Sequence, residues 1–234
     1  MNGCFITGTD TEVGKTRISA GLLHWLGTQG LRSAGYKPVA AGTETIDGEP
    51  VNEDVRALRD ASSVALRDAE VSPFCFDTPC APHIAAELEG RAIDRAALLQ
   101  GAHALAARVD RLVVEGVGGF CVPLGPDFDT ADLAQDLALP VVLVVGLRLG
   151  CISHALLSAE AVRARGLRLA GWVANTVDAA MLQRDENLAT LRHELGRRHQ
   201  APCLGVVPRL ASPAPAAVAA QLDGPALRAL FGLA

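Results

Sequence analysis

Short apolar runs alternate along the chain with longer segments in which apolar residues recur every three or four positions. The apolar runs predict strands at residues 3–7, 33–39, 111–115, 140–145, 167–174 and 203–207. The longer pattern predicts helices at residues 15–28, 53–60, 82–87, 94–108, 129–137, 150–165, 181–199 and 225–233. Strands that alternate with helices in this way are typical of a parallel sheet with helices on both faces.

Three stretches interrupt this alternation. Residues 41–50 and 72–82 are predicted to be irregular loops, and residues 211–221 a loose segment rich in alanine and proline. No change of composition divides the chain, so we expect residues 1–234 to form a single α/β domain with a doubly wound, mostly parallel sheet. Ligands of such domains gather where the strands end, an edge that would carry Gly8, Lys37, Glu115, Gly150, Asn175 and Pro208.

A glycine-rich loop joins the first predicted strand to the first predicted helix. It runs from Gly8 to Thr16, ends in Gly14-Lys15-Thr16, and has its first glycine one place earlier than the usual motif. Backbone N–H groups at such a junction bind phosphate, the lysine adds positive charge, and the threonine hydroxyl is a Mg²⁺ ligand. A glycine turn with a solvated lysine is the alternative. The order of strand, loop and helix favours a nucleotide site in a P-loop NTPase-like domain.

Composition and charge narrow the classes of partner. Half of the 234 residues are hydrophobic and 20% are charged, as expected of a globular protein. The net charge of −5 argues against a nucleic-acid partner. The longest apolar run, at residues 139–146, is too short to cross a membrane. Six scattered cysteines without metal-ligand spacing, and no secretory signal before the first strand, indicate a cytoplasmic protein.

Three charged residues lie where they could serve a bound nucleotide. Glu115 ends a buried strand and could reach a metal ion held by the loop, although an exposed acid at an ordinary turn is the alternative. Asp54 stands in the first turn of a helix that Asn52 can cap, which the helix dipole alone would explain. Lys37 precedes Pro38 and should end a strand beside the loop, although most lysines are simply solvated.

Two further positions offer polar groups at the same edge. Asn175 ends a predicted strand, and its amide presents the donor and acceptor that suit the edge of adenine, although it could equally form a turn. Gly150 opens a helix after a buried strand, so backbone N–H groups there could bind a carboxylate, or the position could be a plain helix cap. The residues alone therefore predict a Mg-ATP enzyme or switch with a lysine and a second anion site.

Several motifs together resemble the dethiobiotin synthetases, the ATP-dependent enzymes of biotin biosynthesis. The resemblance covers roughly residues 3–210, and the early glycine of the phosphate loop is shared with the family. The motifs are the loop at residues 8–16, Ala34-Gly35-Tyr36-Lys37-Pro38-Val39-Ala40, Pro82-His83-Ile84, Val114-Glu115-Gly116, Leu149-Gly150-Cys151-Ile152 and Ala170-Gly171-Trp172-Val173-Ala174-Asn175.

The resemblance implies a specific reaction. CO₂ adds to one amine of 7,8-diaminononanoate to give a carbamate, ATP phosphorylates the carbamate, and the second amine closes the cyclic urea. ADP and phosphate leave. The family works as a homodimer in which the helix start of one subunit binds the substrate carboxylate of the other, and Mg²⁺ is the cofactor.

The resemblance also assigns residues by position. It implies that Lys15 and Lys37 are catalytic and that Thr16, Asp54 and Glu115 bind Mg²⁺. It places the diaminononanoate at Thr11, Lys37, Ala41, Gly150, Cys151 and Ser153. It places ATP at Glu12, Val13, Gly14, Lys15, Thr16, Arg17, Asp54, Glu115, Gly116, Val117, Gly118, Asn175, Thr176, Pro208, Arg209 and Leu210.

The chain departs from the family at three places. Ala41 stands where serine is common, and Ser153 stands where asparagine is frequent. No acidic residue follows Leu210 near the position expected to contact the ribose.

Two other classes of protein share the predicted fold. ATP-driven switch proteins place a signature lysine early in the phosphate loop, where this chain has Asp10, and a switch gives no role to Lys37. Amide ligases of the cobyrinate type carry a glutaminase domain with a nucleophilic cysteine, for which this chain is too short.

Overall fold

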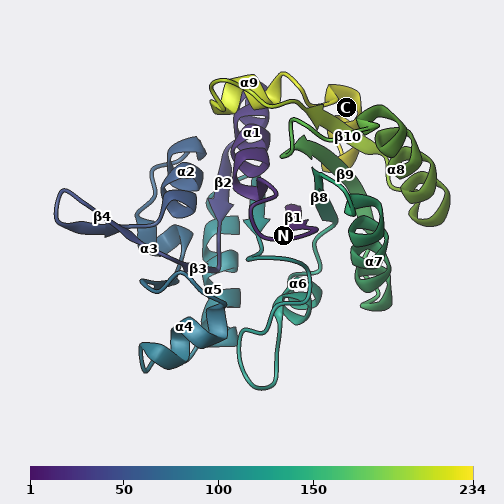
Figure 1. Ribbon diagram of the computed structural model, residues 1–234. Coiled ribbons are helices and arrows are strands. Elements are labelled where there is room, and N and C mark those ends of the chain that lie inside the picture. The colour runs from purple at the N-terminus through teal and green to yellow at the C-terminus, as the bar shows by residue number, and fades with distance from the viewer. Residues whose placement is uncertain (234) are drawn as a thin grey trace.

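The computed structural model describes residues 1–233 and is built on a six-stranded parallel sheet (Figure 1). Its strands lie in the order β10-β9-β8-β1-β7-β2. They are β1 (Gly3–Gly8), β2 (Ser33–Tyr36), β7 (Arg111–Glu115), β8 (Val141–Leu147), β9 (Leu169–Thr176) and β10 (Cys203–Val207). All six coincide with predicted apolar runs, so the α/β fold with a parallel sheet is confirmed.

Helices cover both faces of the sheet, as predicted, and each strand turns alternate side chains to opposite faces. On β1, Ile6 packs toward α1 (Lys15–Thr28), whereas Phe5 packs toward α6 (Thr130–Leu137). The first face also holds α2 (Glu53–Ala61), α3 (Asp68–Val71), α9 (Pro215–Ala219) and α10 (Gly224–Phe231). The second holds α4 (Pro82–Leu88), α5 (Arg95–Ala106), α7 (Cys151–Ala164) and α8 (Arg184–His199).

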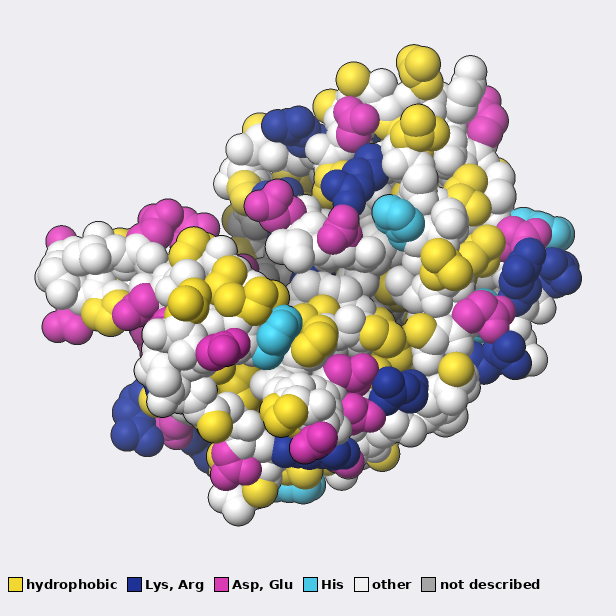
Figure 2. Space-filling view, turned by 60° about the horizontal axis from the view of Figure 1, so that its bottom comes forward, with side chains coloured by type: hydrophobic (Ala, Val, Ile, Leu, Met, Phe, Trp, Pro, Cys, Tyr) yellow, Lys and Arg dark blue, Asp and Glu magenta, His cyan; other side chains and the backbone are white. Residues whose placement is uncertain are grey.

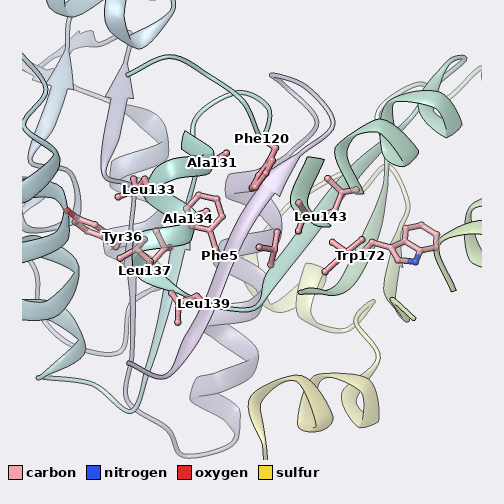
Figure 3. Packing of buried hydrophobic residues seen from close by; sticks show 14 of the residues in the cluster. Phe5, Tyr36, Phe120, Ala131, Leu133, Ala134, Leu137, Leu139, Leu143 and Trp172 are labelled. Carbon is pink, nitrogen blue, oxygen red and sulfur yellow. The ribbon is translucent and has the colours of Figure 1, made fainter. Parts of the chain in front are cut away.

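The larger of the two cores lies on the α6 side of the sheet. Figure 3 shows Phe5 among leucines and alanines of α6, and Leu143 and Trp172 further along in the same cluster. All three are fully buried, and each such side chain contributes about 1.5–3 kcal/mol to the free energy of folding. Tyr36 is buried too and donates its hydroxyl to the carbonyl of Leu98, 2.7 Å away, which fixes the end of β2 against α5. The buried core and this hydrogen bond therefore fix the carboxyl end of β2.

The structure corrects the prediction of one strand over residues 33–39. The strand β2 ends at Tyr36, because Pro38 has no N–H to donate and the Lys37 N–H bonds instead to the Val71 carbonyl. A separate strand β3 (Val39–Ala41) pairs with β6 (Phe74–Phe76), inside a stretch that was predicted to be irregular. This interruption leaves Lys37 between the main sheet and the small one.

The predicted loop at residues 41–50 is a β-hairpin. Its strands are β4 (Glu44–Ile46) and β5 (Glu49–Val51), joined by Asp47-Gly48 with both φ angles positive. That dipeptide between extended segments is a strong hairpin signal, and the prediction missed it. The hairpin projects from one side of the molecule and exposes acidic side chains (Figures 1 and 2).

The segment predicted to be a loose connector contains α9, which packs on α1. A Cβ on Gly21 of α1 would lie 2.6 Å from Val218, so the close approach of the two helices requires a glycine there. Among residues 1–233, no helix combines the length and the apolar character that a membrane span needs.

Candidate active site

The phosphate loop lies between β1 and α1, at the carboxyl edge of the sheet. Gly14 caps α1 with φ of +89°, a conformation that side-chain-bearing residues rarely adopt. A Cβ at Gly14 would also lie 2.3 Å from the side-chain nitrogen of Asn175. The loop therefore needs glycine here for two independent reasons, and its helix N-terminus points to the place where phosphate would bind.

Lys15 extends back along the loop. Its Nζ donates to the Asp10 carbonyl at 2.9 Å, and only 6% of the residue is exposed. Burial lowers the pKa of Lys15 to about 8. Burying a charged ammonium costs free energy, and a bound anion offsets that cost. The position of Lys15 therefore fits a lysine that binds phosphate.

A second lysine joins two carboxylates beside the loop. Lys37 Nζ donates to Glu115 Oε1 at 2.9 Å and to Asp54 Oδ2. Burial disfavours the charged form of Lys37, but the Glu115 and Asp54 carboxylates outweigh it and raise its pKa. Burial acts to raise the pKa of Asp54, yet the Lys37 ammonium and the Thr16 hydroxyl hold it below its ordinary value. Lys15 and Lys37 are the only lysines among the 234 residues.

The three residues predicted to bind a metal ion come together around Thr16. Its Oγ1 lies 2.7 Å from Asp54 Oδ1 and 2.7 Å from Glu115 Oε1. A hydroxyl has one hydrogen, so it can donate to only one of these carboxylates at a time. The other oxygen of Glu115 is buried and has no hydrogen-bond partner. Crowded oxygens with an unpartnered carboxylate atom are the hard donor set that Mg²⁺ requires, so these residues fit the cofactor.

A cavity of about 870 Å³ opens above this cluster. Many of the predicted site residues line it: Thr11, Glu12, Gly14, Lys15, Thr16, Arg17, Lys37, Ala41, Asp54, Val117 and Gly118. Its other lining residues were not predicted from the sequence: Asp10, Pro79, Cys80, Ala81, Pro82, Gly119 and Val122. Pro79 and Pro82 restrict the backbone around Cys80 and Ala81. These prolines were the sequence signal that could have identified residues 79–82 as part of the cavity lining. A cavity of this size can hold a nucleotide tail together with a second substrate.

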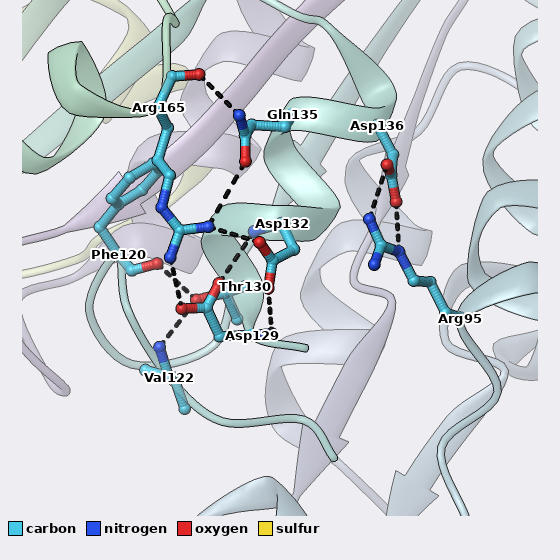
Figure 4. Close-up of polar contacts among 9 residues, drawn as sticks. All are labelled: Arg95, Phe120, Val122, Asp129, Thr130, Asp132, Gln135, Asp136 and Arg165. Carbon is cyan, nitrogen blue, oxygen red and sulfur yellow. Dashed lines mark hydrogen bonds and ion pairs between the residues drawn. The ribbon is translucent and has the colours of Figure 1, made fainter. Parts of the chain in front are cut away.

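The wall from Val117 to Val122 is fixed from behind by α6. Thr130 donates its hydroxyl to the Phe120 carbonyl at 2.6 Å and accepts from the Val122 N–H at 3.0 Å (Figure 4). Asp129 caps the same helix, and Arg165 of the loop after α7 pairs with Asp129 and Asp132. The chain that borders the cavity is thus tied to a helix and not left as a free loop.

The residues predicted for adenine lie further along the same edge and do not line the cavity. Asn175 is inside β9 and not at its end, and Thr176 is the last residue of that strand. Asn175 is in register with Val207, so the segment Pro208–Leu210 that follows β10 lies beside it. The Asn175 amide donates to the Val13 carbonyl at 2.8 Å, a contact the sequence did not predict. Gly116 follows Glu115 and bonds to Ile6, below the cavity.

The predicted carboxylate site at residues 150–153 lies on the far side of the phosphate loop. Gly150 has φ of +94° and begins α7 without a side-chain cap, as predicted. Cys151 is buried and Ser153 is exposed. Just before them, Arg148 pairs with Asp10 of the phosphate loop, which links the two segments. None of the three predicted residues lines the cavity of their own chain.

Comparison with known proteins gives family matches over most of the chain. A family model described as an AAA domain matches residues 2–217. An ATP-dependent dethiobiotin synthetase BioD from Aromatoleum aromaticum is 56% identical over 221 residues, which cover 94% of this chain and 96% of that protein. A second one, from a Janthinobacterium species, is 54% identical over 224 residues, which cover 94% and 93%.

Solved structures share the fold at low sequence identity. The MinC:MinD cell division complex of Aquifex aeolicus matches with a TM-score of 0.57 and 15% identity over 100% of this chain and 97% of that one. The septum site-determining protein MinD of Pyrococcus horikoshii, complexed with Mg-ADP, matches with a TM-score of 0.55 and 15% identity over 97% and 98%. The P-loop NTPase-like fold is confirmed.

Proposed function

The chain belongs to the family of ATP-dependent dethiobiotin synthetases, and we propose that the cavity beside its phosphate loop is where the ureido ring of dethiobiotin is closed. The substrates are ATP, CO₂ and 7,8-diaminononanoate. The observation that carries the proposal is that Lys37, Asp54 and Thr16 line a cavity that the phosphate loop borders, and that Lys37 and Thr16 also bind the buried Glu115.

The chemistry proceeds in three steps in this proposal. A neutral amine of the substrate attacks CO₂, forms a C–N bond and loses a proton, which gives a carbamate. A carbamate oxygen attacks the γ-phosphorus of ATP, and the bond to the β–γ bridging oxygen breaks to release ADP. The second amine, in its neutral form, then attacks the carbamoyl carbon and loses a proton, and the C–O bond to the phosphoryl group breaks to release phosphate as the ring closes.

Each step has a group in the cavity that can serve it. Lys15 holds the β- and γ-phosphates from the loop side, and Lys37 neutralises charge on the carbamate oxygen and on the transferred phosphoryl group. Thr16, Asp54 and Glu115 would hold Mg²⁺, which neutralises phosphate charge when it is bound. Thr11 lies at the cavity edge where the diamine would wait, and Ala41 and the Pro79–Pro82 wall offer apolar surface to its methylenes.

Adenine lies in this proposal beyond the cavity, against Asn175, Thr176 and the segment Pro208–Leu210. The Asn175 Oδ1 atom is buried without a partner and can accept a hydrogen bond from the exocyclic amino group of adenine. Glu12, Val13, Arg17 and residues Gly116–Gly118 border the phosphates and sugar between the two ends. Nothing in this placement requires an acid after Leu210.

The substrate carboxylate is bound in this proposal by the start of α7 of a second subunit, in a homodimer. Leu149, immediately before that helix start, is 92% exposed, and Leu157 of the same helix is 67% exposed. Large exposed apolar side chains favour contact with another protein surface. The exposed N–H groups after Gly150 would then reach the far end of a substrate whose diamine lies in the partner's cavity.

The proposal is tested by following ATP hydrolysis with and without diaminononanoate and bicarbonate, with Mg²⁺ present. We expect ADP to form only in the full mixture and the organic product to have the mass of the cyclic urea. The Lys37→Gln variant should lose the product, and the Arg95→Gln variant, which changes a surface ion pair on α5, should keep it. Equal ATP turnover without the diamine would favour a switch protein and reject the proposal.

A further inference from the structure

The side chain of Asn175 links two parts of the nucleotide site that lie on different elements. Asn175 is in β9, in register with Gly146 of β8 on one side and Val207 of β10 on the other. Its residue is only 1% exposed. The Nδ2 atom donates to the carbonyl of Val13, which belongs to the phosphate loop 162 residues earlier in the chain.

The contact on the loop side is tight. The position where a Gly14 side chain would begin lies 2.3 Å from the Asn175 nitrogen, so the amide lies directly against the loop. Val13 is itself buried, and its side chain approaches Gly146 closely enough that a Cβ on Gly146 would lie 2.9 Å from it. The Asn175 amide and the phosphate loop are therefore in direct contact.

The other end of the same amide is unused. The Oδ1 atom is buried and has no hydrogen-bond partner within residues 1–233. A buried amide oxygen without a partner costs free energy, which a ligand that donates to it would recover. The segment after β10, which lies beside Asn175, is where the adenine is placed in the proposed function.

We propose that Asn175 is a positioning residue that couples occupation of the adenine site to the shape of the phosphate loop. The inference rests on the proposed function for the location of the adenine. A carboxamide is planar, so a base that donates to Oδ1 fixes the orientation in which Nδ2 faces the Val13 carbonyl. When adenine holds Oδ1, the phosphate loop loses part of the conformational freedom that phosphate binding would otherwise have to remove. Binding of the base and binding of the phosphates therefore favour each other.

The coupling is measured with the two halves of ATP as separate ligands. The affinity of the wild-type protein for inorganic tripolyphosphate, with Mg²⁺, is determined by calorimetry without adenosine and with saturating adenosine. We expect adenosine to tighten tripolyphosphate binding by about fivefold, and tripolyphosphate to tighten adenosine binding by the same factor. Unchanged affinity for tripolyphosphate in the presence of bound adenosine overturns the inference.

Variants separate positioning of the loop from recognition of the base. Asn175→Leu removes the amide at similar size and should weaken binding of tripolyphosphate alone by about three- to tenfold, because one buried hydrogen bond to the loop is lost. Thr190→Val is the control, because its exposed hydroxyl bonds only within α8, outside the proposed site, and it should leave tripolyphosphate affinity unchanged. An Asn175→Leu protein that binds tripolyphosphate as tightly as the wild type contradicts the inference.

Hydrogen exchange on the wild-type protein needs no variant and tells the two proposals apart. Adenosine should slow exchange at residues 174–176 and 207–210, and also at residues 12–16, which the base does not touch. If adenosine protects none of these residues, the proposed adenine site fails. If it protects only the first two groups, the adenine site stands and the coupling through Asn175 is rejected.

Discussion

Two regions of the molecule hold acidic side chains in different ways. Beside the cavity, Lys37 binds two carboxylates: Glu115, with which it forms a pair buried away from water, and Asp54, whose side chain is partly exposed. On α6, Arg165 binds Asp129 and Asp132, and Arg95 binds Asp136, all at partly exposed positions (Figure 4). Charges buried together interact strongly and cost much to separate, whereas exposed pairs contribute little.

The difference shows what each region is built to do. A point charge on a flexible stem can turn from a carboxylate to a substrate oxygen, which suits Lys37 to chemistry. A planar guanidinium that bonds two oxygens at once, as Arg95 does with Asp136 at 2.6 and 2.8 Å, holds a fixed geometry. These properties agree with the proposed catalytic role of the first region, and the second holds α6, to which the cavity wall is bonded.

The largest effect is expected from Lys37→Ala. Turnover should fall by about 10²–10³-fold, because a charge that stabilises the transferred group is lost, while ATP affinity changes far less. Steady-state kinetics and calorimetric titration with ATP measure the two quantities. Lys37→Arg should not restore turnover, since a guanidinium is larger and has a different geometry. An unchanged rate in Lys37→Ala would show that the buried pair is only structural.

Glu115→Gln tests the same cluster through the carboxylate that we propose binds Mg²⁺. The concentration of Mg²⁺ needed for half-maximal activity should rise by about tenfold or more, as it does when residues that support a metal ligand are lost. The amide keeps the shape of the side chain but not its charge. Mg²⁺ titration of activity and Mn²⁺ binding in the absence of substrates measure the change. Superimposable titrations for variant and wild type would remove Glu115 from the metal site.

Thr130→Val tests the buried part of the α6 region. Its hydroxyl serves both Phe120 and Val122, so the substitution should lower the free energy of unfolding by about 1–3 kcal/mol. Chemical denaturation gives the value. Thr190→Val is the control, because that exposed hydroxyl bonds only within its own helix and its loss should change stability very little. Equal stabilities of the two variants would mean that α6 does not anchor the wall.

Arg95→Ala and Arg165→Ala test the exposed part. Each should lower the free energy of unfolding by about 1 kcal/mol or less, because its ion pairs are partly solvated. Salt should shrink the effect, and denaturation in low and high salt checks it. If either variant lowered the free energy of unfolding by as much as the loss of a buried ion pair does, the two regions would not differ in what their ion pairs contribute to stability.

The smallest effect is expected from His199, a buried ionisable side chain outside both regions. Its side chain is 3% exposed, and its Nε2 lies 3.5 Å from Glu160 Oε1. Burial lowers its pKa below the ordinary value of 6.5, although the Glu160 carboxylate acts in the opposite direction. The unfolded chain therefore binds the proton more readily, so stability falls as the pH drops below about 6.5. His199→Phe should flatten this part of the profile of Tm against pH. Parallel profiles would contradict the assignment.

Much of this site could be predicted because its signals are local. Gly14-Lys15-Thr16 after a strand identifies the phosphate loop, and a buried strand that ends in Glu115 points to the sheet edge. The meeting of Thr16 with Asp54 depends on packing between distant segments, and a metal-binding role for Asp54 was implied only by the family resemblance. The contacts of Asn175 with Val13 and of Arg148 with Asp10 carry no local signal. The hairpin around Asp47-Gly48 had one, and it was overlooked.

The confinement of Lys15 and Lys37 to the cavity has a practical consequence. Cells fed isotopically labelled lysine would produce a protein whose enriched lysine amines both lie at the cavity beside the phosphate loop. Nuclear magnetic resonance of such a sample would carry two side-chain signals free of background from the rest of the chain. Arrival of each substrate, carbamate formation and phosphoryl transfer could then be watched in turn by the two amines that we expect to take part.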